Sequence, residues 1–268
     1  MTREYKKLVY KRTGGEGEVL WLTMNDESKK NCLSETMQIE LHEVLSEVAR
    51  DNSIRCVVLD GAGDKVFCSG GDINTFQKLD LVTGYDYLYQ RGNSIQHLLT
   101  SMEKPVIAAV GGLCFAGGLE LALACDFIYA TRNAQFGLLE INLGVLAGWG
   151  GTVRLPRAIS ERRAKEMIYR GEIIDATEAH KWGLVNRVFE THEGMRQGLE
   201  QTVTEITSKP PLAVRAAKNV VNNSLTCDSI EAALAIERGS IMWLSSSEDA
   251  KEGIASFVEK RKPKLRGR

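Results

Sequence analysis

Short apolar runs alternate with segments of helical periodicity along the first part of the chain. The runs at 19–24 and 55–59 are typical of strands, and the second reads as a strand covered on both faces. Ser34 can cap a helix from 35 to about 50, where apolar residues recur at helical spacing. Further strands are expected at 66–68, 106–110, 127–130 and 134–136, and helical segments at about 73–102 and 119–124. Strand and helix in alternation predict an α/β protein.

Strand signals fade after about residue 185, and helical patterns follow one another to the end. We expect helices at 194–206, 211–221, 229–244 and 247–260, the second beginning where proline is tolerated. The chain is therefore divided into a core, residues 1–205, and a C-terminal helical region, residues 206–268.

Composition and charge exclude several classes of protein. The 268 residues are 43% hydrophobic and 26% charged, as in globular proteins, and no stretch is apolar enough to span a bilayer. With 34 basic and 35 acidic residues, no overall field favours nucleic acid or a membrane. The exception is 251–268, with seven basic and two acidic residues, which is either a solvated tail or a site for phosphates.

The six cysteines indicate a reducing compartment rather than a metal site. They lie at 32, 56, 68, 114, 125 and 227, form no Cys-x-x-Cys pair and share the chain with only four histidines. Small buried thiols explain them best, so we expect no zinc site. The N-terminus has no apolar signal core, and we expect a cytoplasmic protein.

Two strand exits are rich in glycine, at 67–72 and 110–120. Neither carries the dinucleotide-binding pattern or the lysine and hydroxyl residues of a P-loop. Such glycines can serve tight turns and close packing. Two turns of this kind can also aim two backbone N–H groups at one point, which is how an oxyanion hole is built.

Two glutamates are candidate acid/base residues. Glu120 opens a predicted helix, where a carboxylate is ordinarily favourable, so that alone it reads as a helix-terminal charge. Glu140 lies in a nearly apolar segment, 136–144, where burying a carboxylate is costly. From this pattern Glu140 is expected to be the more unusual of the two. Together the pair could divide the acid and base roles of one reaction.

The chain resembles the crotonase, or enoyl-CoA hydratase/isomerase, superfamily over nearly its whole length. The similarity rests on ordered blocks at 67–73, 104–127, 136–144, 148–156, 179–185 and 252–262. The resemblance implies a crotonase-like spiral of ββα units with a C-terminal helical trimerisation region. It further implies homotrimers, commonly paired into hexamers, and an acyl-CoA thioester as substrate. Coenzyme A is part of that substrate, so no separate cofactor and no metal are expected, and neither nucleic acid nor a membrane is an expected partner.

The resemblance also implies roles for individual residues. The backbone N–H groups of Gly71 and Gly117 would polarise the thioester carbonyl. Family members with both glutamates resemble hydratases, in which Glu120 would orient and deprotonate water and Glu140 would protonate Cα.

Further residues match positions that bind substrate or coenzyme A. In the core these are Gly70, Asp72, Ile73, Gly148 and Trp149. Phe257 and Lys260 match positions that reach the ligand of a neighbouring subunit. Trp149 stands where a small residue is usual, and either packs into the core or reshapes the acyl pocket. Three nearby tyrosines, Tyr85, Tyr87 and Tyr89, either line that pocket or cover a helix surface.

Two other functions are kept in view. One is another reaction on the same scaffold, such as double-bond isomerisation or hydrolysis of an acyl-CoA. The other is a binding homologue with weak activity, for instance one that binds RNA. The intact glutamate pair and both glycine turns favour hydration of a 2-enoyl-CoA thioester over these alternatives.

Overall fold

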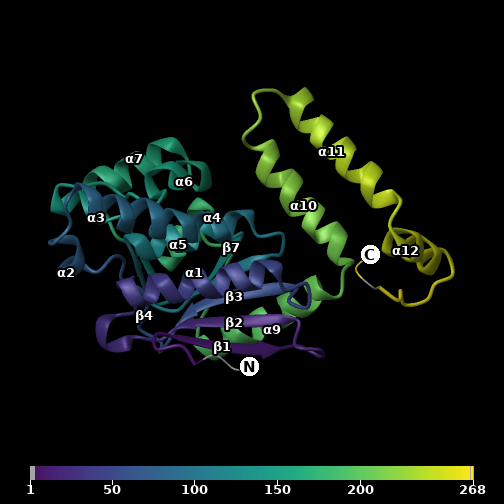
Figure 1. Cartoon of the computed structure of the whole chain (residues 1–268), viewed down its shortest axis with the longest axis horizontal. Coiled ribbons are helices and arrows are strands. Elements are labelled where there is room, and N and C mark those ends of the chain that lie inside the picture. Colours follow the sequence, from purple (N-terminus) through teal and green to yellow (C-terminus); the bar gives the residue numbers. More distant parts are fainter. Residues whose placement is uncertain (1–3, 266, 268) are drawn as a thin grey trace.

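The computed structural model describes residues 4–265 and 267, which fold around two sheets (Figure 1). The larger sheet has its strands side by side in the order β1 (Leu8–Thr13), β2 (Val19–Met24), β3 (Cys56–Gly61), β5 (Val106–Val110), β7 (Phe127–Thr131) and β10 (Arg187–Phe189). Only the pairing of β1 with β2 is antiparallel. The smaller sheet has the order β4 (Val66–Cys68), β6 (Leu113–Phe115), β8 (Gln135–Gly137) and β9 (Ile174–Asp175).

The chain contributes strands to the two sheets alternately. In each of three successive strand pairs, β3–β4, β5–β6 and β7–β8, the first strand joins the larger sheet and the second joins the smaller one. A helical segment follows each pair. The expected spiral of ββα units is therefore confirmed, and it brings the exits of β4 and β6 next to each other.

The helices of the core have local start signals in several places. Helix α1 (Glu35–Arg50) begins as predicted, with Ser34 Oγ accepting a hydrogen bond from the N–H of Met37 at 3.4 Å. The other helices of this part are α2 (Ile73–Phe76), α3 (Leu81–Tyr85), α4 (Ser94–Ser101), α5 (Gly117–Ala124), α6 (Gly151–Ala158), α7 (Glu161–Arg170) and α8 (Ala176–Trp182). The 3-10 helix η1 (Glu27–Lys29) precedes α1, and the π-helix η2 (Asp86–Asn93) and the 3-10 helix η3 (Glu140–Leu143) lie between later helices.

Two expectations about secondary structure were wrong. The segment 73–102 is interrupted once: after α2 the helix restarts at α3, where Asp80 and Thr83 form a reciprocal capping box, and it continues through η2 and α4 to residue 101. No strand was expected after about residue 185, but β10 (Arg187–Phe189) lies there. It has three residues at the edge of the larger sheet, too few to produce a periodic pattern.

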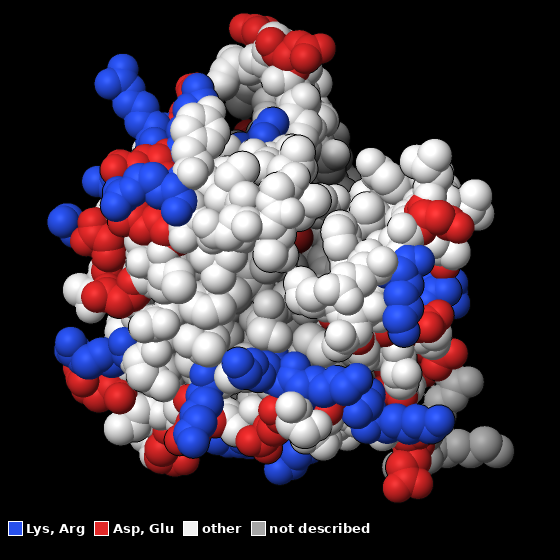
Figure 2. Space-filling model, turned by 90° about the vertical axis from the view of Figure 1, so that its left-hand side faces the viewer, with Lys and Arg blue, Asp and Glu red and all other residues white. Residues whose placement is uncertain are grey.

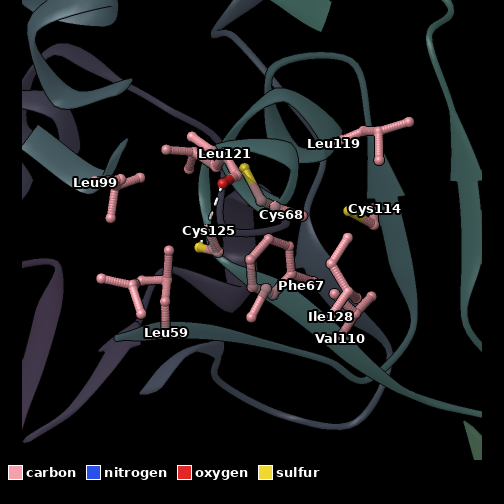
Figure 3. Close-up of a cluster of buried hydrophobic side chains, with 14 of the residues drawn as sticks. Leu59, Phe67, Cys68, Leu99, Val110, Cys114, Leu119, Leu121, Cys125 and Ile128 are labelled. Atoms are coloured by element: carbon pink, nitrogen blue, oxygen red, sulfur yellow. Dashed lines mark hydrogen bonds between the residues drawn. The ribbon is translucent and has the colours of Figure 1, made fainter. Parts of the chain in front are cut away.

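The principal core lies between the sheets and the helices, and it includes buried cysteines. Phe67, Cys68, Cys114 and Cys125 pack among aliphatic side chains, and Cys125 Sγ donates to the carbonyl oxygen of Leu121 at 3.4 Å (Figure 3). All six thiols are free, and all except Cys227 are buried. The interpretation of the cysteines as small core residues holds for these five.

The last three helices extend away from the sheets. Helix α9 (His192–Thr207) covers one face of the larger sheet, whereas α10 (Pro211–Ser224), α11 (Ile230–Ser245) and α12 (Glu248–Val258) form an arm at the other side of the molecule from α2 and α3 (Figure 1). These four helices match the predicted ones to within three residues at each end. The division of the chain at residue 205 stays a prediction. Among the described residues, no helix is long and apolar enough to cross a membrane.

Candidate active site

The two glycine turns meet because β4 and β6 are parallel neighbours. Cys68 pairs with Cys114, so the chain leaves both strands at the same edge of the smaller sheet. Gly70 has a φ of +102°, and a Cβ built on it would lie 2.8 Å from Ala116 Cβ and 3.1 Å from the nitrogen of Gly117. Only glycine permits both this backbone conformation and this approach. As the first residue of α5, Gly117 has an N–H without an acceptor in that helix.

Glu120 lies in the first turn of α5 and is almost fully buried. Its Oε1 accepts hydrogen bonds from the backbone N–H groups of Trp149 and Gly151, each at 2.7 Å. The pKa of Glu120 is raised to about 7, chiefly by burial and also by the charge of Glu140, against the opposing effect of the two N–H groups. The carboxyl group is thus fixed in orientation and titrates near neutrality.

Glu140 begins η3 and is only half buried. Burial raises the pKa of its carboxyl group, and its Oε2 has no hydrogen-bond partner within the described part of the chain. The expectation that Glu140 is the more unusual carboxylate was wrong, because Glu120 is the more deeply buried. The local sequence could not show this, since the 148–151 loop that covers Glu120 comes from far along the chain.

Trp149 occupies the space beside the glycine turns. Its side chain is 5% exposed, and Cβ atoms built on Gly117 and Gly71 would lie 2.5 Å from its Cζ3 and 3.5 Å from its Cη2. The Tyr87 ring is its aromatic neighbour, with centroids 5.6 Å apart. Trp149 is therefore packed in the core and borders the two turns, and its effect on an acyl pocket stays a prediction.

The three tyrosines differ in burial, and lining of the acyl pocket stays a prediction. Tyr87 is buried, and its hydroxyl donates to the carbonyl oxygen of Leu33 at 3.1 Å. Tyr85 and Tyr89 are exposed and pack on each other at the surface, with centroids 5.2 Å apart.

The remaining candidate residues of the core lie at the rim of these elements. Asp72 caps α2 through Oδ1, which accepts from the N–H of Asn74 at 3.0 Å, and Ile73 is exposed. Gly148 is exposed and precedes Trp149. Figure 2 shows the side of the molecule that carries α2 and α3, where a broad uncharged surface is hollowed near its middle.

Phe257 and Lys260 are not brought to the two glutamates within one chain. Phe257 is 85% exposed on α12, which lies across the molecule from α2 and α3 (Figure 1). In the basic segment, Arg261 is paired with Glu252 and Glu259 at the surface, so part of its charge is neutralised. Arg266 and Arg268 lie outside the described residues.

Sequence reasoning missed three residues that shape this region. Gly151 supplies one N–H to Glu120, Gly92 faces the indole of Trp149, and the Arg154 guanidinium donates to the carbonyl oxygen of Trp149 at 3.0 Å. The Gly-Trp-Gly-Gly pattern was a signal for the first, because clustered glycines often present backbone N–H groups. Gly92 and Arg154 gave no local signal.

Two glycine turns that meet at one sheet edge, beside two carboxyl groups with raised pKa values, define a class of enzymes that stabilise an anion at a carbonyl and move protons. The sequence pattern of the enoyl-CoA hydratase/isomerase family matches residues 14–268. The chain belongs to this family, within the crotonase superfamily.

Named relatives and solved structures cover nearly the whole chain. A short-chain-enoyl-CoA hydratase of Clostridium acetobutylicum is 38% identical over 247 residues, which are 92% of this chain and 94% of that one. A crotonyl-CoA hydratase of Syntrophomonas wolfei is 36% identical over the same shares of the two chains. The crystal structure of an enoyl-CoA hydratase from Bacillus anthracis has a TM-score of 0.93 at 33% identity and covers 98% of this chain and 100% of that one.

Proposed function

We propose that this protein is an enoyl-CoA hydratase, a hydro-lyase that adds water to a 2-enoyl-CoA thioester. The observation that supports it most is the pair of carboxyl groups, Glu120 and Glu140, both with raised pKa values, in which the charge of Glu140 contributes to the raised pKa of Glu120. The related hydratases of Clostridium and Syntrophomonas support the same reaction.

In this proposal the backbone N–H groups of Gly71 and Gly117 donate to the thioester carbonyl oxygen. Glu120, as carboxylate, takes a proton from water while the water oxygen bonds to Cβ. The electron pair of the double bond moves onto the thioester as an enolate, which the two N–H groups stabilise. Glu140 then delivers its proton to Cα, and one water has been added. Gly70, Asp72, Ile73, Gly148 and Trp149 bound the site. Coenzyme A enters as part of the substrate, and no other cofactor takes part.

The fixed orientation of Glu120 favours it for the water-activating role. Two N–H groups share its Oε1, which leaves Oε2 to meet a water molecule. Glu140 Oε2, buried and without a partner among the described residues, is suited to hold the proton that goes to Cα.

The experiment uses crotonyl-CoA and the purified protein. Hydration removes the conjugated double bond, so the ultraviolet absorbance of the enoyl thioester falls, and mass spectrometry finds a product heavier by one water. Isomerase activity would instead conjugate a 3-enoyl-CoA and raise the absorbance. Hydrolysis would release a free thiol that a thiol reagent detects, and a binding homologue would bind crotonyl-CoA without turnover. Any of these three results in place of hydration contradicts the proposal.

The proposed assembly is a homotrimer, or a hexamer formed by two trimers, in the cytoplasm. Helix α11 has no buried residue in the single chain, and α11 and α12 expose Ile241, Met242, Trp243, Phe257 and Val258. Apolar surface of this extent is favourable only when a partner covers it. Contact with a second copy would also bring Phe257 and Lys260 to a neighbour's ligand. Light scattering tests the assembly, and a monomeric mass would contradict it.

A further inference from the structure

Three glycines from three separate elements leave the space that the Trp149 indole fills. A Cβ built on Gly92 would lie 2.0 Å from Nε1, which is a severe overlap, and one on Gly117 would lie 2.5 Å from Cζ3. Gly71 follows at 3.5 Å from Cη2. One end of the indole therefore rests on the π-helix η2 and the other on the two turns of the candidate oxyanion hole.

Tyr87 forms the fourth side of the space that the indole fills, which we call the Trp149 slot. The Tyr87 hydroxyl donates to the carbonyl oxygen of Leu33 at 3.1 Å and accepts from the N–H of Asp72 at 3.3 Å, so its ring cannot turn away. Its plane is tilted by 48° from that of the indole. The indole is thus confined on all these sides by atoms that have little freedom to move.

Two unfavourable features accompany the indole in this slot. Nε1 of Trp149 is buried without a hydrogen-bond partner among the residues described, and burying an unpaired donor costs free energy. Gly92 lies within a helical segment, where glycine is less favourable than alanine. A phenylalanine at 149 would avoid the first cost. The indole therefore carries a cost at this position that a smaller apolar ring would not, and its six-membered ring contacts the two turns.

We infer that Trp149 is the residue that limits the length of the acyl chain, and that the site takes short 2-enoyl thioesters of roughly four to six carbons. This inference rests on the proposed function. A thioester carbonyl held at Gly71 and Gly117 puts the acyl chain beside the indole that covers both glycines. The backbone N–H of Trp149 is bonded to Glu120, so the indole also starts next to the group that would act at Cβ. Carbons of the acyl chain beyond Cβ would therefore soon contact the Trp149 indole.

Binding of unreactive saturated thioesters tests this inference without turnover. Calorimetry with butyryl-, octanoyl- and palmitoyl-CoA is compared for the wild type, Trp149→Ala and Tyr89→Ala, which changes an exposed aromatic residue of η2. We expect the wild type and Tyr89→Ala to bind the longer chains no better than butyryl-CoA. Trp149→Ala should gain about tenfold or more for octanoyl-CoA, as filling an apolar pocket predicts. Affinity that rises steadily with chain length in the wild type would overturn the inference.

A second pair of variants tests the slot itself. Gly92→Ala forces its methyl group against Nε1 and should push the indole onto the two glycine turns, lowering kcat for crotonyl-CoA. Trp149→Ala in the Gly92→Ala background removes the overlap, so the double variant should be more active than Gly92→Ala alone. Effects that simply add would contradict the slot. If crotonyl-CoA is not hydrated at all, the proposed function fails, whereas the binding series still decides the inference.

Discussion

Oε1 of Glu120 accepts a hydrogen bond from the backbone N–H of Trp149 at 2.7 Å, and this contact joins a buried carboxyl group to the loop that carries the indole. The backbone N–H of Gly151 donates to the same oxygen at 2.7 Å, and Gly151 is the first residue of α6. The position of the proposed base and the wall of the proposed acyl pocket are therefore set by one loop. A change in this loop should alter both rate and substrate preference.

Glu120→Gln and Glu140→Gln should each lower kcat for hydration of crotonyl-CoA by about 10²–10⁴-fold, since each removes one proton-transfer group. The substitutions nearly preserve shape, so circular dichroism should report an unchanged fold. Steady-state kinetics provides the measurement. Near-wild-type activity in either variant would show that the two-glutamate mechanism is wrong for this protein.

The rate should depend on pH through the carboxyl group of Glu120. Its pKa is raised to about 7, with the charge of Glu140 among the causes, and the proposed reaction needs Glu120 ionised and Glu140 protonated. The pair is active with one proton, so kcat/KM should pass through a maximum, rising as the first carboxyl group ionises and falling as the second does. The apparent pKa values belong to the Glu120–Glu140 pair, because the two groups interact. A profile of kcat/KM between pH 5.5 and 8.5 measures them. A flat profile over this range would contradict the proposed role of Glu120.

The free energy of unfolding should depend on pH through Glu120, which stabilises the fold at low pH. A carboxyl group whose pKa is lowered by folding, the more usual case, stabilises it at high pH. Because burial raises the pKa of Glu120 from 4.5 to about 7, the folded state binds more protons than the unfolded state between these values. This group's contribution is present below about pH 4.5 and is lost as the pH rises through 7. The loss is on the order of 3 kcal/mol in the free energy of unfolding.

Urea unfolding at pH 5 and pH 8 compares the wild type with Glu120→Gln, which cannot ionise. The wild type should lose more stability than the variant between the two pH values. An equal loss in both proteins would mean that Glu120 does not titrate in this range.

Much of the core could be predicted because its signals are local. Ser34 and the residues of α1 carry both a cap and a helical pattern, and the apolar run of β3 needs no partner to be recognised. Helix α6 went unpredicted for a physical reason. Its first N–H is satisfied by Glu120 rather than by a local cap, the preceding Gly150 has a φ of +101°, and Pro156 lies inside it.

The candidate site was predicted in part for the same reason. The family resemblance indicated Glu120, Glu140, Gly71 and Gly117 by position. The need for glycine at position 92 could not be predicted from the residues around it. It arises from contact with the indole of Trp149, which lies far along the chain. The burial of Glu120 likewise arises from a contact between distant segments.

Deletion of residues 251–268 should raise KM for the CoA thioester or dissociate the proposed trimer. The segment carries Phe257 and Lys260, which are exposed in the single chain. Lys260→Ala separates the two effects, because loss of one exposed charge should raise KM and leave the mass in light scattering unchanged. If the deletion changes neither KM nor mass, the basic segment is a solvated tail.

Gly70→Ala should disturb the proposed oxyanion hole, and Gly183→Ala is its matched control. Both glycines have positive φ, +102° and +88°, so alanine strains the backbone at each by roughly 1–2 kcal/mol. At Gly183, beyond the C-terminus of α8, the new methyl group meets only the carbonyl oxygen of Ala158 at 3.8 Å. At Gly70 it lies 2.8 Å from Ala116 Cβ and 3.1 Å from the nitrogen of Gly117, which must move.

Loss of one oxyanion donor lowers kcat by about 10²–10³-fold, and we expect a decrease of this size only in Gly70→Ala. Thermal unfolding should show a loss of stability from backbone strain in both variants, and a larger one in Gly70→Ala, where the overlap with Ala116 adds to that strain. An equal decrease of kcat in the two would assign the effect to strain in the fold, and not to the donor at Gly117.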